Sequence, residues 1–184
     1  MNKMIPRTVL DFWFSAGSDK WFKKDQAFDA KIVSLFSEAV VAAGEGAFDD
    51  WRKTPEGALA LVILLDQFPR NIHRGHADAF AYDARAREVA RGAIDLKYDT
   101  HIPATARQWF YMPFMHSEAL DDQEVCIQLL ESRLAEDEGT LRFAILHRDL
   151  IARFGRFPHR NKVLGRPSTP DELTYLSSKN AFSG

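Results

Sequence analysis

Apolar residues recur along the chain at spacings of three and four, which is the pattern of helices with one buried face. One such stripe follows Asp25 and ends at Gly44, a residue type common at helix C-termini. A second run opens with Thr54-Pro55-Glu56, which combines an N-cap, a first-turn proline and an acid at the positive end of the helix dipole. Its apolar residues up to position 65 face all sides, so we expect this helix at the centre of the fold.

A short buried strand over residues 61–65 is the alternative interpretation, since short apolar runs are ambiguous by periodicity. The Thr-Pro-Glu start and the length of the run favour a helix. The sequence contains no alternating strand pattern and no Asn-Gly or Asp-Gly hairpin. Further helices are expected over residues 83–93, from Pro103 to about Pro113, from Ser117-Glu118 onward, after Gly139, and after the cap motif beginning at Ser168.

These elements predict an all-α protein of about eight or nine helices. Because the connections are short, neighbouring helices should form antiparallel pairs packed side by side. No low-complexity linker divides them, so we predict a single domain over residues 1–184, with a frayed tail at residues 177–184.

The composition is that of an ordinary globular protein, with 46% hydrophobic and 27% charged residues. The longest apolar run, residues 58–65, is far shorter than the ~20 residues of a membrane span. Residues 1–7 lack the apolar segment of a secretion signal. Cys126, the one cysteine, lies in an apolar-periodic segment, so we expect a buried, inert thiol rather than a nucleophile. We therefore expect a cytoplasmic protein without membrane association.

Charge is unevenly distributed although the net charge is only −2. Acidic residues dominate positions 118–138, and basic residues dominate positions 142–166. Such blocks are usually solvated faces or complementary neighbouring helices. A basic groove for an acidic peptide, a small phosphate or RNA is the sharper alternative. Nucleic acid ranks lowest, because stacking aromatics are not interleaved with the arginines and the pI is near 6.3.

Two segments resemble each other, at residues 66–75 and 156–165. Each follows an apolar helix and carries Phe-Pro, then Arg-Asn, then Gly. In the structural interpretation, proline stops the helix while Arg and Asn bond its last carbonyl groups. In the functional interpretation, both turns present guanidinium and amide donors to an anionic ligand.

Several long stretches resemble the bacterial family known as domain of unknown function 924. The longest is LVILLDQFPRNIHRG at residues 61–75, and the others are VLDFWF (9–14), AFAYD (79–83), FYMPFMHSE (110–118), RFGRFPHRN (153–161) and LGRPSTPDE (164–172). The resemblance implies an all-helical fold of the tetratricopeptide-like class, in which helical hairpins stack. It implies no activity.

Candidate chemistry is sparse. His116-Ser117-Glu118 should lie at a helix start, where Ser117 would be the N-cap or the backbone amides would bind an anion. His147 lies within an apolar stripe and is either a satisfied core residue or a catalytic one. Metal-ligand spacing, a nucleophile elbow and phosphate loops are all missing from the sequence, so we predict neither a metal nor a cofactor.

Three hypotheses remain. The leading one is a binding module for an acidic peptide segment or a small anion, with donors from Arg70, Asn71, Arg156, His159, Arg160 and Asn161. The second is a hydrolase or lyase in which His116 or His147 acts as acid and base with Glu118 as its orienter. The third is a scaffolding protein in which these polar residues only cap helices.

Overall fold

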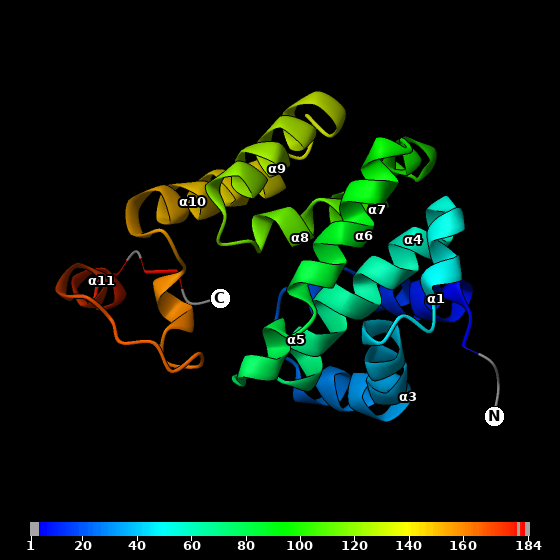
Figure 1. The fold of residues 1–184 in the computed structure, drawn as a ribbon, viewed down its shortest axis with the longest axis horizontal. Coiled ribbons are helices and arrows are strands. Elements are labelled where there is room, and N and C mark those ends of the chain that lie inside the picture. Colours follow the sequence, from blue (N-terminus) through cyan, green and yellow to red (C-terminus); the bar gives the residue numbers. More distant parts are fainter. Residues whose placement is uncertain (1–3, 180, 183–184) are drawn as a thin grey trace. The chain divides into compact units, whose positions relative to one another are not determined.

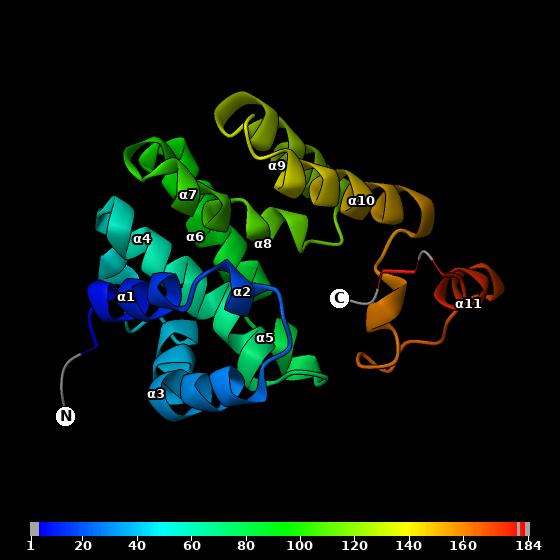
Figure 2. The ribbon, with the colours of Figure 1, turned by 180° about the vertical axis from the view of Figure 1, so that it is seen from behind.

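A computed structural model describes residues 4–179, 181 and 182 of the chain. In that part the regular structure is helical and contains no strand, which confirms the all-α prediction. The chain divides into two compact units, residues 1–74 with 78–113 and residues 75–77 with 114–184. We describe each unit by itself (Figures 1 and 2). One domain over residues 1–184 and tetratricopeptide-like stacking both stay predictions.

The first unit is built around α4 (Pro55–Val62), which packs against α1 (Pro6–Ala16) and α6 (Asp83–Asp95). Residues 58–65 are each at most 1% exposed, so the prediction of a central helix is confirmed. Thr54 caps α4 by accepting a hydrogen bond from the Gly57 N–H. The other helices of this unit are α2 (Ser18–Trp21), α3 (Gln26–Gly44), α5 (Phe68–Ile72) and α7 (Ala104–Arg107). Its 3-10 segments are Asp49–Lys53, Tyr98–His101, Gln108–Phe110 and most of Ala77–Phe80.

The sequence indicated that proline stops the helix at this turn, but the helical chain after α4 continues through Pro69. A π-helical turn, Ile63–Gln67, connects α4 to α5, and Phe68 N–H bonds the Ile63 carbonyl. Pro69 then falls in the first turn of α5, where a proline is tolerated because the N–H it lacks would have no helical partner. The structural interpretation of this turn was therefore wrong about proline.

The helix expected from Pro103 to Pro113 is also wrong in form. It is divided into α7, the 3-10 segment Gln108–Phe110 and α8 (Met112–Met115). Trp109, Phe110 and Tyr111 are all at most 1% exposed. Three consecutive side chains on a regular α-helix spread over about 200°, so burying all three favours a broken backbone over one straight helix.

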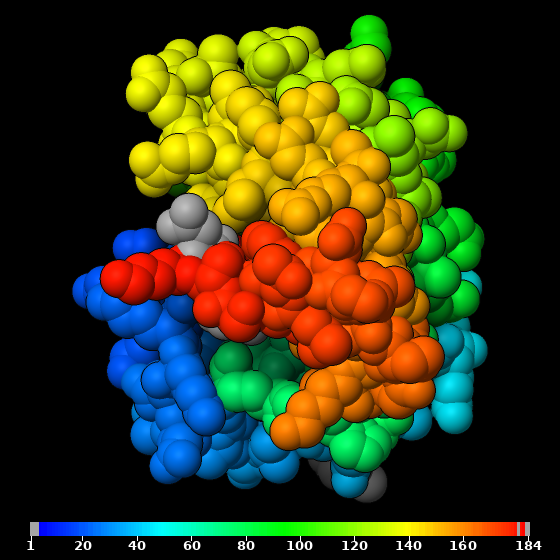
Figure 3. Space-filling model, turned by 90° about the vertical axis from the view of Figure 1, so that its left-hand side faces the viewer, coloured from blue at the N-terminus to red at the C-terminus, as the bar shows by residue number. Residues whose placement is uncertain are grey.

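The second unit contains a helical hairpin of α9 (Leu120–Arg133) and α10 (Glu138–Phe154), which pack along each other (Figure 1). Gly155 ends α10 with a φ of 68°, a left-handed conformation that glycine adopts without strain. The chain continues through the 3-10 segment Pro158–Arg160 to α11 (Pro170–Leu176). Figure 3 shows α11 and the segment before it at the surface, in orange to red.

A small apolar cluster of Leu150, Ile151 and Phe157 lies beneath this surface, and Phe182 packs against it. Of the tail predicted to fray, positions 180, 183 and 184 lie outside the described residues. Among the helices of the described part, none combines the length and the apolar character that crossing a membrane requires.

Candidate functional site

The first Phe-Pro turn uses its arginine inside the protein. Both terminal nitrogens of Arg70 bond the Asp83 carboxylate, at 2.8 and 3.0 Å, and Nη1 also donates to the Asp66 carbonyl at 2.7 Å. Arg70 therefore ties α5 to the start of α6. Arg70 thus bonds a carbonyl of the π-helical turn Ile63–Gln67, whereas the structural interpretation expected a bond to one of the last carbonyls of the helix.

The neighbouring amide is engaged in the same way. Asn71 Nδ2 donates to Asp29 at 2.8 Å, and Arg74 forms two further bonds to the same carboxylate. Burial acts to raise the pKa of Asp29, but the bonds from Arg74 and Asn71 outweigh it and hold that pKa below its usual value. Asp29 thereby links α3 to the end of α5.

The second turn repeats this pattern around Glu172 on α11. Arg156 forms a bidentate pair with the Glu172 carboxylate, at 2.6 and 2.8 Å. Asn161 Nδ2 donates to the same carboxylate, as does the Thr169 N–H at the N-cap. The Arg156 hydrogen bond is the main reason that the pKa of Glu172 falls to about 2.

A second arginine of this region forms a bidentate pair with the Glu118 carboxylate. Arg166 bonds both of its oxygens, at 2.6 and 2.9 Å, and the Phe157 N–H donates to it at 2.8 Å. Burial acts to raise the pKa of Glu118, but these donors outweigh it and the pKa lies below its usual value. Glu118 thus joins the residues before α9 to the turn after α10.

The helix that we expected to start at Ser117 starts at Leu120. Ser117 Oγ accepts a hydrogen bond from the Ala119 N–H and donates one to Asp122. His116 lies just before, and its carbonyl accepts a bond of 2.9 Å from Arg160. The Arg160 guanidinium also lies 4.4 Å from the centre of the Phe157 ring, a cation–π contact. The bond from Arg160 comes from 44 positions away, so the local sequence does not reveal it.

Two of the candidate histidines meet at Phe182. Its ring centre lies 4.6 Å from that of His147 and 5.2 Å from that of His159, both edge to face. Phe157 contacts the same two imidazoles, at 5.3 and 5.5 Å. His147 Nδ1 bonds the Phe143 carbonyl at 2.7 Å, so this nitrogen carries the proton.

Both imidazoles are neutral at pH 7. The pKa of His147 is lowered to about 4, mainly by burial and to a smaller extent by His116 and Arg160, although the bond to the Phe143 carbonyl acts to raise it. Burial, followed by the charges of Arg160 and His147, lowers the pKa of His159 to about 4. His147 therefore lies within electrostatic range of both His116 and His159.

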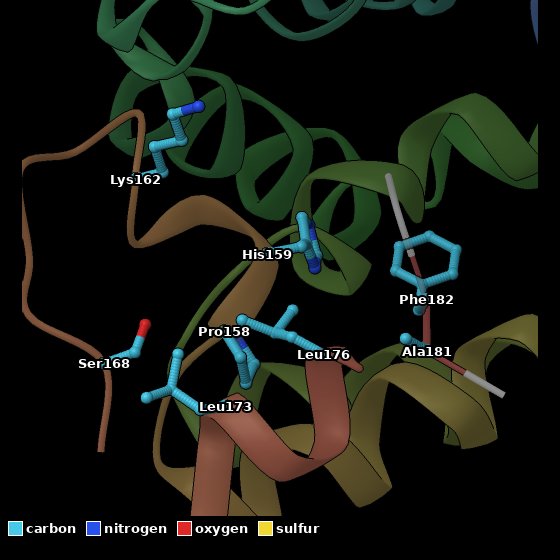
Figure 4. A pocket seen from close by; sticks show the side chains of 8 residues that line it. All are labelled: Pro158, His159, Lys162, Ser168, Leu173, Leu176, Ala181 and Phe182. Carbon is cyan, nitrogen blue, oxygen red and sulfur yellow. The ribbon is translucent and has the colours of Figure 1, made fainter. Parts of the chain in front are cut away.

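A cavity of about 390 Å³ opens beside His159. Figure 4 shows the eight side chains that line it: Pro158, His159, Lys162, Ser168, Leu173, Leu176, Ala181 and Phe182. His159 Nδ1 is buried and has no hydrogen-bond partner among the residues that the structure describes. The exposed Lys162 forms no ion pair with any described residue. Ser168 accepts a bond from Asn161, which leaves its hydroxyl hydrogen available as a donor.

Sequence reasoning did not single out Lys162, Ser168 or Phe182 as site residues. Lys162 lies inside the second Arg-Asn segment, and Ser168 directly precedes the Thr-Pro-Asp-Glu cap, so both had a local signal. Phe182 is the one aromatic residue after Leu176, an exception within a polar tail. Its packing partners lie on α10 and in the Pro158–Arg160 segment, and no local pattern indicates them.

Cys126 is fully buried, and burial raises the pKa of its thiol to about 12. The prediction of a buried, inert thiol is therefore confirmed. Within the described ranges, no group of three or more His, Cys, Asp and Glu side chains could hold a metal ion. The two Phe-Pro turns belong to different units, and ligand binding by their arginines and asparagines stays a prediction.

The chain was compared with known proteins. No curated protein matches it. A solved structure of a protein of unknown function from Agrobacterium tumefaciens is similar, with a TM-score of 0.90 and 42% sequence identity, covering 94% of this chain and 96% of that one. The model of a bacterial family of proteins of unknown function, DUF924, matches residues 9–180. The chain therefore belongs to the DUF924 family.

Proposed function

We propose that this protein binds a small carboxylate with an apolar body, in the cavity beside the second Phe-Pro turn. The observation that carries the proposal is the buried Nδ1 of His159, which has no hydrogen-bond partner within the described part of the chain. Leaving a buried polar atom unpaired is unfavourable by about 1–3 kcal/mol. A ligand oxygen or N–H bonded to this atom would remove the penalty, and His159 is one of the residues that line the cavity.

The apolar part of the ligand is argued from the lining. Five of the eight lining residues are apolar: Pro158, Leu173, Leu176, Ala181 and Phe182. The volume of about 390 Å³ falls within the range of about 300–1,000 Å³ typical of small-molecule sites. A short alkyl chain or a single aromatic ring suits such a lining.

The carboxylate is argued from the charge at the rim. Lys162 supplies a mobile positive charge, and the Ser168 hydroxyl supplies a neutral donor. In the first turn Arg70 pairs with Asp66 and Asp83. In the second unit Arg156 pairs with Glu172, and Arg166, directly after the second turn, pairs with Glu118. These three arginines therefore support the fold. This favours a small anion over the acidic peptide of our leading sequence hypothesis, because a peptide would need more unpaired cations.

Isothermal titration with 4-phenylbutyrate and with the uncharged 4-phenylbutanol tests the proposal. We expect the carboxylate to bind more tightly than the alcohol, and Lys162→Ala to weaken carboxylate binding about fivefold, or ~1 kcal/mol. The matched control is Lys31→Ala, which removes another exposed lysine on α3 and should leave affinity unchanged. Equal affinity of the two probes, or equal effects of the two substitutions, would contradict the proposal.

The second hypothesis, a hydrolase or lyase, needs Glu118 to orient a histidine. Both oxygens of Glu118 accept bonds from Arg166, and one accepts a further bond from the Phe157 N–H. This arrangement favours a role in holding the chain together over a role in acid–base chemistry. We therefore advance binding rather than catalysis.

A further inference from the structure

The ring of Phe182 occupies a slot formed by the rings of His147, Phe157 and His159, which we term the aromatic slot. Both imidazoles approach the Phe182 ring edge to face, at 66° and 76°. Aromatic pairs in this geometry contribute about 0.5–1.5 kcal/mol each beyond the area they bury. The slot therefore recognises the shape and the quadrupole of an aromatic ring, rather than apolar surface in general.

The backbone of the same residue is also recognised. The Phe182 N–H donates a hydrogen bond of 2.8 Å to the Tyr175 hydroxyl, which comes from α11. Tyr175 itself is partly buried and packs on Phe154 of α10. A ring held in a pocket and a main-chain bond beside it are the two components of peptide recognition, since pockets provide specificity and main-chain bonds provide affinity.

Few residues hold the segment that contains Ala181 and Phe182 in the aromatic slot. Two adjacent residues, Ala181 and Phe182, line the cavity, and neither belongs to a helix. A tethered segment of this length has an effective concentration in the millimolar range at its site. A partner segment replaces it when the ratio of its concentration to its Kd exceeds the ratio of this effective concentration to the Kd of residues 181–182 for the slot.

We propose that the aromatic slot is a peptide-binding site, that residues 181–182 are its internal occupant, and that a phenylalanine-bearing segment of a partner protein displaces them. This goes beyond the binding of a small carboxylate, because it uses neither Lys162 nor a negative charge on the ligand. Binding of the partner opens one wall of the cavity, since Phe182 lines it.

Fluorescence anisotropy with a labelled peptide of the chain's own residues 178–184, SKNAFSG, tests the proposal. Phe182→Ala in the full chain vacates the slot, so we expect it to bind the peptide at least tenfold more tightly than the wild type does. The same peptide with alanine in place of phenylalanine should bind neither protein. Phe143→Ala, at an exposed aromatic residue of α10 (48% exposed), is the matched control and should behave as the wild type.

Equal binding of the peptide to wild type and Phe182→Ala, or equal binding of the two peptides to Phe182→Ala, would overturn the proposal. Imidazole resonances of His147 and His159 provide a second measurement, since the peptide should shift them in Phe182→Ala and leave them unchanged in the wild type. Titration of the same variants with 4-phenylbutyrate separates the two proposals. If Phe182→Ala does not bind the peptide but still binds 4-phenylbutyrate, only the proposal of a peptide-binding slot is refuted. If it binds the peptide but not 4-phenylbutyrate, only the carboxylate site is refuted.

Discussion

Glu172 joins more parts of the second unit than any other residue described above. Its side chain is only 2% exposed and accepts bonds from Arg156, from Asn161 and from the backbone of Thr169. A carboxylate buried in this way is stable only while all its donors remain in place. This side chain therefore connects the first part of the segment after α10 to the start of α11.

Replacing Glu172 by glutamine should lower the free energy of unfolding at pH 7 by about 2 kcal/mol, because charge-assisted bonds to a buried group are lost. The pKa of Glu172 is about 2 in the folded protein, against an ordinary 4.5. Its stabilising contribution is therefore complete above pH 4.5 and is lost as the pH falls towards 2. Urea denaturation should show a smaller difference in the free energy of unfolding between wild type and variant at pH 3 than at pH 7.

The matched control is Glu131→Gln on the exposed side of α9. We expect a change of about 0.5 kcal/mol or less there, as is usual for surface substitutions. A Glu172→Gln variant as stable as this control would show that the bonds around Glu172 contribute nothing to stability.

Residue roles were partly accessible from the sequence. The arginine of each turn was expected to serve either the fold or a ligand, and the structure gives its partners within the protein. Those partners were inaccessible, because Arg70 pairs with a residue 13 positions away and Arg156 with one 16 positions away. Such pairings depend on how helices pack, and a local pattern contains no information about that.

At the scale of helices, the sequence predicted the first residues of a helix correctly where a local capping motif marks them. Asp25, Thr54 and Thr169 all cap the helices that their motifs indicated, and Thr169 with Glu172 forms a complete capping box. The π-helical turn before Pro69 and the broken segment around Trp109 were missed. In both places the burial of consecutive large residues overrides the regular spacing of an α-helix.

Thr169→Ala should lower the free energy of unfolding by about 1 kcal/mol, the usual effect of removing an N-cap. Thr169→Ser keeps the oxygen that accepts from the Glu172 N–H and should retain most of the stability. Hydrogen exchange should accelerate in α11 of the alanine variant first, since the cap acts on that helix. If serine and alanine prove equally destabilising, the hydroxyl does not act as a cap.

At the scale of the whole molecule, the all-helical class and the central helix were predictable because the apolar pattern runs through most of the chain. The cavity was not, because its walls come from residues 158–168, from α11 and from residues 181–182. Only folding brings these segments together. Two neutral histidines, the buried His147 and the half-buried His159, give the protein a dependence on pH that its composition does not suggest.

The free energy of unfolding should fall as the pH is lowered from 6.5 to 4. In this range the unfolded chain protonates His147 and His159, whose ordinary pKa is 6.5, while the folded protein with pKa values of about 4 does not. Each such histidine contributes a slope of up to about 1.4 kcal/mol per pH unit. Thermal denaturation across this range measures the slope.

A His147→Asn, His159→Gln double variant should lose most of this decline, because neither replacement titrates. His101→Gln, at an exposed position, serves as the control and should follow the wild type. A double variant that loses stability with pH as steeply as the wild type would assign the decline to other groups.

The burial of Cys126 has a practical consequence. A protonated thiol without solvent access does not react with maleimides or iodoacetamides at neutral pH. The native cysteine therefore does not interfere with site-specific labelling. One cysteine introduced near residue 182 would carry the only dye. Departure of the terminal segment from its slot then becomes visible as a change in the fluorescence of that dye, without removal of any native residue.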